Sequence, residues 1–225
     1  MVCYIICTIC LDSDYESVID LYVSGVMENA PVAFKQLLGF PSTQLLLAVG
    51  FLLSLAATGS ILLPTCIVLC ALAFLWWCCR DFFCFYVTNA LVTDMRDIRK
   101  HYIEMDGHCF WVAESAGEVV GMVAALPFLH PGGEKYVELK RMSVAKSHRG
   151  MGIAKDLCRT SIDFACKRGC DGVVLTTSTG QVGGWNLYEK TGFIRTHSSS
   201  PPNWSTRLSG IKLLHYQYNI KRGGQ

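Results

Sequence analysis

The chain has 225 residues, and its 20 lysines and arginines against 18 aspartates and glutamates give a net charge of +2. Because so balanced a chain has no basic field to hold phosphate backbones, we expect no nucleic-acid partner. The length is sufficient for one sizeable domain with an appendage.

The twelve cysteines form no disulfide pattern, and the zinc-like pair Cys7 and Cys10 has no second pair of ligands. We therefore expect no metal site and free thiols in a reducing compartment. Three cysteines near the long apolar segment are candidates for palmitoylation by position alone. These are Cys78, Cys79 and Cys84.

The first predicted elements are a β-branched strand over residues 2–9 and a helix over residues 15–28, capped by Asp12-Ser13-Asp14. Pro31 and Pro41 bracket a short apolar helix after it.

An apolar segment follows, because residues 36–79 contain no Asp, Glu, Lys, Arg or His. One membrane helix needs about 20 apolar residues, so the 35 residues of 45–79 are long for one span and short for two. We expect residues 44–79 to enter a lipid bilayer, with a bend near Pro64; the alternative is a buried core hairpin.

The rest of the chain alternates strand and helix patterns. We expect Thr93 and Asp94 to cap a helix reaching about Met105, after an aromatic interfacial stretch over 82–92. Two strands joined by Ser115-Ala116-Gly117 then predict a hairpin. The remaining predicted elements are strand 136–144, helix 155–168, strand 172–176, helix 182–190, and strands 193–196 and 211–218. This order predicts an α/β fold with a mixed sheet and helices on both faces.

The most informative motif is Arg149-Gly150-Met151-Gly152-Ile153-Ala154, between a predicted strand and a predicted helix. Glycines there leave backbone N–H groups uncovered at the positive end of the helix dipole, an arrangement that binds phosphate. G-x-G-x-x-G is absent, which argues against a dinucleotide-binding fold, and a P-loop is excluded because Gly-Lys-Ser/Thr is missing.

This motif resembles the Gln/Arg-x-x-Gly-x-Gly/Ala pyrophosphate motif of the GNAT acyltransferases, whose fixed places Arg149, Gly152 and Ala154 fill. A second motif, Leu187 to Phe193, resembles that superfamily's L-Y-x-K-x-G-F signature. The resemblance implies the GNAT acyltransferase fold and acetyl-CoA as cosubstrate.

The chain is more closely similar to the camello-like, or N-acetyltransferase 8, family. The stretches that match its pattern are 28–38, 93–98 and 110–115. This implies an acetyltransferase domain in two pieces, 1–35 and 81–225, around a membrane hairpin at 36–80. Both flanks must then lie on one membrane side, so the hairpin crosses twice or is re-entrant. Lys35 and Arg80 favour cytosolic ends. The implied location is the endoplasmic reticulum membrane, with the Golgi or perinuclear membrane as alternatives.

The resemblance also assigns cofactor roles. Backbone N–H groups of 150–154 would hold the pyrophosphate, with Arg149 adding charge, and pantetheine would pair with the backbone of 142–144, where one N–H polarises the thioester carbonyl. Gln181 and Gly184 stand where many members carry Asn and Ala. The expected cofactor residues are Met142, Ser143, Val144, Arg149, Gly150, Met151, Gly152, Ile153, Ala154 and Gln181.

Two residues are candidates for proton transfer. Tyr188 either protonates the departing coenzyme A thiolate or only packs. Glu138 either takes the amine's proton through water or is a solvated strand carboxylate. The implied acceptor is a primary amine. The favoured acceptors are cysteine S-conjugates, as in mercapturate formation. The alternative acceptors are protein lysines, in histone H4 or secretory-pathway proteins. A different alternative is an inactive coenzyme A-binding scaffold.

Overall fold

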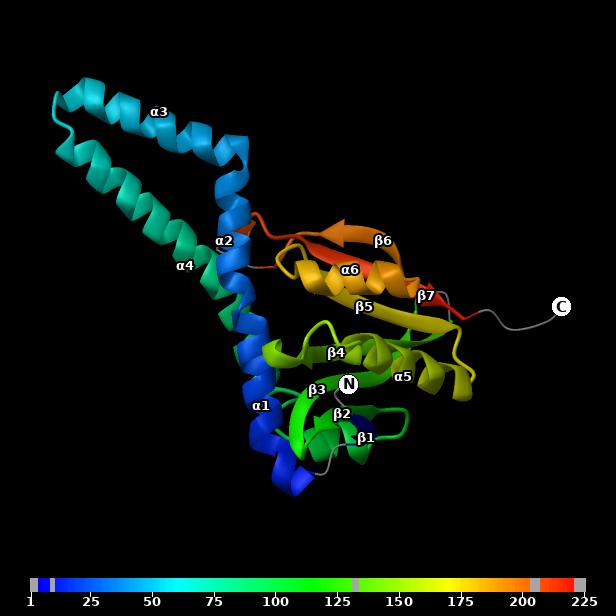
Figure 1. The fold of residues 1–225 in the computed structure, drawn as a ribbon. Helices are drawn as coiled ribbons and strands as arrows, with labels where there is room; N and C mark the ends of the chain where they lie inside the picture. Colours follow the sequence, from blue (N-terminus) through cyan, green and yellow to red (C-terminus); the bar gives the residue numbers. More distant parts are fainter. Residues whose placement is uncertain (1–3, 9–10, 131–133, 203–206, 221–225) are drawn as a thin grey trace.

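The computed structural model describes residues 4–8, 11–130, 134–202 and 207–220. Within these ranges, seven strands form one mixed sheet in the order β1-β2-β3-β4-β5-β7-β6 (Figure 1). The strands are β1 (Ile5–Thr8), β2 (Cys109–Ser115), β3 (Glu118–Leu129), β4 (Lys135–Val144), β5 (Gly172–Ser178), β6 (Ile194–Ser199) and β7 (Leu213–Asn219). The helices are α1 (Leu11–Met27), α2 (Asn29–Gly39), α3 (Pro41–Thr58), α4 (Leu62–Val92), α5 (Ile153–Lys167) and α6 (Val182–Thr191). The predicted α/β class is confirmed.

The sheet joins the two ends of the apolar insertion into one domain. β1 precedes the insertion and pairs antiparallel with β2, which follows it. β2 and β3 form the predicted hairpin, and its turn residues Ala116 and Gly117 have φ of 52° and 82°, as a tight hairpin turn requires.

Helices cover both faces of the sheet. On one face, α5 and α6 enclose a core to which α5 contributes Ile153, Leu157 and Ala165. On the other face, α1 and the end of α4 enclose a second core around Met122 and Phe110. β4 lies between the two layers, so each of its side chains belongs to one or the other.

β4 and β5 separate partway along their length. Their parallel pairing runs only from Tyr136 opposite Gly172 to Leu139 opposite Leu175. On its other edge, β4 carries a β-bulge, since one residue of β3 between Met122 and Ala124 faces two residues of β4. The bulged residue Arg141 has φ of 55°. Beyond the bulge, β4 bends away and leaves its β5-facing edge unpaired.

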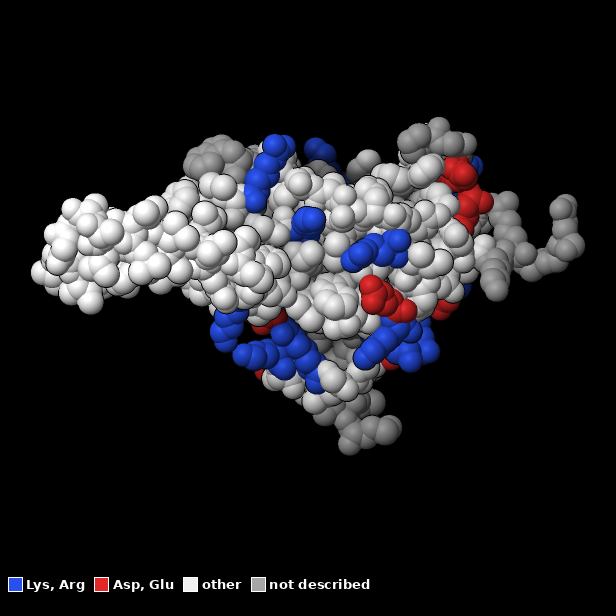
Figure 2. All heavy atoms as spheres, turned by 90° about the horizontal axis from the view of Figure 1, so that it is seen from above, with Lys and Arg blue, Asp and Glu red and all other residues white. Residues whose placement is uncertain are grey.

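α3 and the first half of α4 form an antiparallel pair that projects from the domain (Figure 1). Pro41–Thr58 has mean hydropathy 1.5 with none of it buried, and Leu62–Val92 has mean hydropathy 2.2. Both are candidate membrane spans by length and composition. Figure 2 shows this projection without a charged side chain, while Lys, Arg, Asp and Glu gather on the domain.

Several predicted boundaries differ from the structure. The first helix begins at Leu11, so Asp14 lies inside it instead of capping it. The bend of the hairpin lies at Gly59, not Pro64. Gly59 takes φ of 64° and ends α3, whereas a proline in the first turn of α4 costs no hydrogen bond.

The helix predicted over 93–105 is wrong. α4 continues to Val92, and only a short π-helical turn, Arg99–Ile103, follows. Asp94 does not cap a helix, because its carboxylate binds Arg141 and Tyr102. The aromatic stretch before it belongs to α4, and its Phe82 and Phe83 side chains are buried against the domain, while Phe85 is exposed.

The cysteines proposed for palmitoylation are mostly inaccessible. Cys78 and Cys79 are fully buried, and Cys84 is half-buried with its sulfur 4.0 Å from Met27 Sδ. Cys10 of the zinc-like pair lies outside the described residues.

α1 lies close against β4 because Gly25 has no side chain. A Cβ at Gly25 would overlap Ser143 Oγ, which donates a hydrogen bond to the Leu21 carbonyl at 3.1 Å. We expect Gly25→Ala to rotate this hydroxyl and to lose the bond, about 1 kcal/mol. The better helix propensity of alanine offsets about 0.5 kcal/mol of this loss. The melting temperature in detergent should therefore fall by about 1–2 °C.

Ser143→Ala by itself removes the same hydrogen bond. Adding Gly25→Ala to it should therefore cause no further loss, since the remaining Cβ of residue 143 lies 3.4 Å from the added methyl. Gly39→Ala, with open space around it, is the matched control. Additive losses in the double variant would contradict the proposed contact.

Candidate active site

The glycine-containing loop between β4 and α5 is built for close approach of an anion. Gly150 and Gly152 have φ of 78° and 93°, which favour glycine, and Gly152 is the N-cap of α5. In the described part of the chain, the backbone N–H groups of 150–154 have no hydrogen-bond partner. Ile153 is buried and fixes the loop to the core, while Met151 is 43% exposed and Ala154 is partly buried.

Arg149 is held at the side of this loop. Its Nε donates to the Val144 carbonyl at 3.0 Å, and its guanidinium forms an ion pair with Glu28. Glu28 lies at the junction of α1 and α2, before the apolar insertion. The charge expected at the mouth of the loop is therefore balanced by a carboxylate 121 positions earlier in the chain.

Residues 142–144 offer their backbone and not their side chains. Met142 and Val144 pack into the core under α5 and α6, and the Ser143 hydroxyl binds α1. One backbone edge pairs with β3. The other faces the separation from β5, where a ligand can add to the sheet.

Tyr188 points at this same strand. Its hydroxyl lies 3.8 Å from Met142 Sδ, and the side chain is 7% exposed between the rings of Phe193 and Tyr216. Burial, and secondarily the nearby Cys158, raises the pKa of Tyr188 well above its ordinary value. The phenol therefore remains protonated at neutral pH and can donate a proton.

Gln181 holds the turn between β5 and α6. Its Oε1 accepts hydrogen bonds from Thr177 Oγ1 at 2.9 Å and from the Ser178 backbone N–H at 3.3 Å. Its oxygen therefore positions the start of the helix that carries Tyr188.

Glu138 lies on the opposite face of the sheet from Tyr188. Its neighbour Leu139 belongs to the core under α5, so strand alternation turns Glu138 the other way. Its carboxylate forms an ion pair with Lys140 at 3.1 Å. The structure thus places the two candidate proton-transfer residues on opposite faces of the sheet, with Glu138 in the last paired part of β4 before its separation from β5.

A polar group that the sequence analysis missed lies on the Glu138 face. His215 bonds to Thr176 Oγ1 at 3.1 Å and Ser199 Oγ at 2.8 Å, and it stacks on His197 with ring centroids 4.1 Å apart. Burial and the neighbouring His197 lower the pKa of His215. No sequence spacing could reveal this group, because three strands assemble it.

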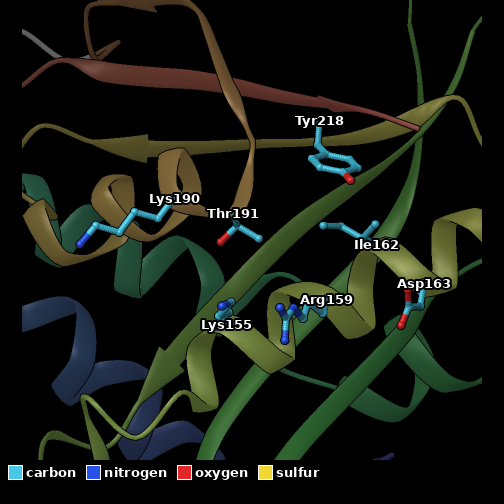
Figure 3. A pocket seen from close by; sticks show the side chains of 7 residues that line it. All are labelled: Lys155, Arg159, Ile162, Asp163, Lys190, Thr191 and Tyr218. Atoms are coloured by element: carbon cyan, nitrogen blue, oxygen red, sulfur yellow. The ribbon is translucent and has the colours of Figure 1, made fainter. Parts of the chain in front are cut away.

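A cavity of about 390 Å³ opens beside the glycine loop, between α5 and the end of α6 (Figure 3). Lys155 and Arg159 line it from α5, and Lys190 lines it from α6 with its side chain turned away from them in Figure 3. The other lining residues are Ile162, Asp163, Thr191 and Tyr218. Three cations against one carboxylate suit a further phosphate. The spacing of Lys155 and Arg159, one helical turn apart directly after the loop, was the signal available in the sequence.

Comparisons with known proteins agree with this geometry. Residues 73–193 match the acetyltransferase (GNAT) family. A GNAT acetyltransferase from Staphylococcus aureus MU50 has a similar fold, with a TM-score of 0.56 and 17% identity, over 97% of this chain and all of that one. The fold and the family match define a GNAT acetyltransferase.

Curated relatives narrow this class. The chain is 42% identical to N-acetyltransferase 8B of Rattus norvegicus, over 98% of this chain and 99% of that protein. It is also 42% identical to N-acetyltransferase 8 of Mus musculus, over 93% and 92% of the two chains. The chain therefore belongs to the N-acetyltransferase 8, or camello-like, family: it is an N-acetyltransferase, and acetyl-CoA is its cosubstrate.

The start of α6 has room for a methyl group at Gly184. A Cβ there would lie 3.6 Å from Thr177 Oγ1 and 3.7 Å from the Tyr188 ring, which are ordinary contacts. We expect Gly184→Ala to stabilise the protein by about 0.5 kcal/mol, because glycine costs helices entropy. Thermal unfolding in detergent measures this gain.

Gly192→Ala is the control with the opposite sign. Gly192 ends the same helix at φ of 100°, a conformation that alanine disfavours. A lower melting temperature for Gly184→Ala would contradict the geometry at the start of α6.

Proposed function

We propose that the chain acetylates a primary amine with acetyl-CoA bound across the β4–β5 separation. The observation that carries this proposal is a juxtaposition. The unpaired edge of β4, the uncovered N–H groups of 150–154 and the Tyr188 hydroxyl all meet at one end of this separation.

In this proposal, pantetheine pairs with the backbone of 142–144 and the pyrophosphate lies on the N–H groups of 150–154. Arg149 holds the loop against Val144 and Glu28. The cavity lined by Lys155, Arg159 and Lys190 receives the 3′-phosphate end of the cofactor, because it continues along α5 from the loop.

The amine approaches from the face that carries Glu138. Its nitrogen attacks the thioester carbonyl, whose developing negative charge a backbone N–H of 142–144 stabilises. The C–S bond breaks, and the departing thiolate takes its proton from Tyr188. Glu138 accepts the proton that the amine loses, directly or through water, so both protons are accounted for.

Cysteine S-conjugates are the proposed acceptors. Lys140 lies beside Glu138 on the acceptor face, and its ammonium can bind the carboxylate of an amino-acid conjugate. An apolar S-substituent would partition toward the membrane that the α3–α4 hairpin enters. A lysine side chain within a protein lacks this free carboxylate.

Thiol release from acetyl-CoA by the full chain in detergent tests the function. Benzyl-cysteine should be the best acceptor in a panel that also contains a histone H4 peptide and free aspartate. Faster release with the peptide would show that the acceptor is a protein lysine, while the proposed acetyl transfer would stand. No release with any amine would overturn the proposed function.

Removal of the Tyr188 hydroxyl should slow the reaction. We expect Tyr188→Phe to lower kcat about 100-fold, since a general acid contributes on the order of 10²–10⁴-fold. Tyr216→Phe is the matched control, because it removes a phenol of the same core that binds Glu189 instead. In the wild type, deprotonation of Tyr188 should cause no loss of rate between pH 7 and 9.5, because its pKa is raised. If Tyr188→Phe keeps the wild-type kcat, Tyr188 is not the general acid.

We also propose that residues 36–80 form a two-pass hairpin in the endoplasmic reticulum membrane, inserted between the two pieces 1–35 and 81–225 of one cytosolic domain. The 18 residues of α3 reach about 27 Å, close to the hydrocarbon thickness of a bilayer. The pairing of β1 with β2 requires both flanks on one side.

Epitope tags at the two termini should both be digested when protease is added to intact microsomes. A tag inserted after Gly59, in the turn between α3 and α4, should be protected until detergent is added. Protection of only one terminal tag would contradict a two-pass hairpin.

A further inference from the structure

Arg141, the residue at the β-bulge of β4, is held by a half-buried polar network. Its Nε donates to Asp94 Oδ2 at 2.9 Å, its NH2 to Asp94 Oδ1 at 2.6 Å, and its NH1 to the Tyr22 hydroxyl at 2.9 Å. Tyr102 donates a second hydrogen bond to Oδ2, and Thr93 Oγ1 donates to Oδ1 at 2.9 Å. The Arg141 and Asp94 side chains are only 14% and 19% exposed.

The backbone of Arg141 explains why such a network is needed. Its φ of 55° is left-handed, a conformation that a residue with a Cβ disfavours. Ala116, at a hairpin turn, is the other non-glycine residue with positive φ in the described chain. A strained residue persists where the surrounding contacts determine its position, and here two hydrogen bonds to one carboxylate fix the guanidinium.

We propose that the Asp94–Arg141 pair is a positioning device that holds the bulge of β4 and thereby the cofactor-facing edge of 142–144. This inference rests on the proposed function, because that edge is the proposed site of the acyl group. Asp94 lies two residues after the end of α4, so the device also ties the return of the membrane hairpin to the strand beside the reaction.

The network is a permanent brace and not a pH switch. Burial alone would raise the pKa of Asp94, but hydrogen bonds and the charge of Arg141, with the Tyr102 and Thr93 hydroxyls, lower it to about 2. Burial lowers the pKa of Arg141, but the hydrogen bonds and the charge of Asp94 outweigh this effect and raise it above its ordinary value. Both partners remain charged throughout the physiological range.

Two double variants of the full chain separate the backbone role of Arg141 from its charge. Asp94→Asn/Arg141→Ala and Asp94→Asn/Arg141→Gly both remove the ion pair, but only glycine adopts the bulge conformation without strain. We expect the alanine variant to lose at least tenfold in kcat, with faster amide hydrogen exchange at 141–144. The glycine variant should recover most of both. KM for acetyl-CoA should rise in the alanine variant, because pantetheine is proposed to pair with 142–144, and it should fall back in the glycine variant.

Equal kcat and equal exchange in the two double variants would overturn the proposal. If neither accumulates as folded protein, Arg141→Lys decides, since lysine keeps the charge but cannot form the two-pronged pair. Unchanged kcat and exchange in that variant would also overturn it. Tyr15→Phe is the control. Tyr15 lies in α1, as Tyr22 does, but its hydroxyl donates to the Met95 and Arg96 carbonyls and not to the Arg141 network.

Hydrogen exchange keeps this test separate from the proposed function. If the wild type releases no thiol with any amine, the proposed function fails, yet faster exchange in the alanine variant alone still supports the brace.

Discussion

Two neighbouring parallel strands that stop pairing leave backbone donors and acceptors without partners, which a sheet tolerates only where something else can occupy them. In this chain, β4 and β5 part after Leu139 and Leu175, and the bulge at Arg141 bends β4 away. The glycine loop, Tyr188 and Glu138 are all arranged around this separation. The loop follows the end of the bent strand, the phenol points at it from one face, and the carboxylate lies on the other.

The apolar insertion and the proposed cofactor site are connected through the same domain. The insertion interrupts the chain between β1 and β2, yet both strands pair in one sheet. Glu28, at the junction of α1 and α2 before the insertion, binds Arg149 of the glycine loop, and Asp94, just after the end of α4, binds Arg141 at the bulge. One ion pair thus joins the chain on each side of the insertion to one end of the proposed cofactor site.

Local patterns predicted much of this fold. The hairpin at Ser115-Ala116-Gly117, the helix predicted over 155–168 and the glycine loop could be predicted because the relevant residues are neighbours in the sequence. The errors arose where distant residues decide the structure. Asp94 reads as a helix cap until Arg141, 47 positions later, is known to hold its carboxylate, and Arg149 reads as a free cation until Glu28 is placed. Likewise, the sequence predicts a bend at Pro64, because proline interrupts helices more strongly than glycine does. In the structure it is Gly59 that adopts the left-handed conformation that ends α3.

The central claim is that acetyl-CoA occupies the separation between β4 and β5 and is held by the glycine loop. Amide hydrogen exchange of the full chain in detergent, with and without saturating coenzyme A, tests it most directly. The account predicts slower exchange on coenzyme A binding at 142–144 and 150–154, with little change along the outer edge strand β6. Binding that leaves both segments unprotected, or protects β6 instead, would contradict it.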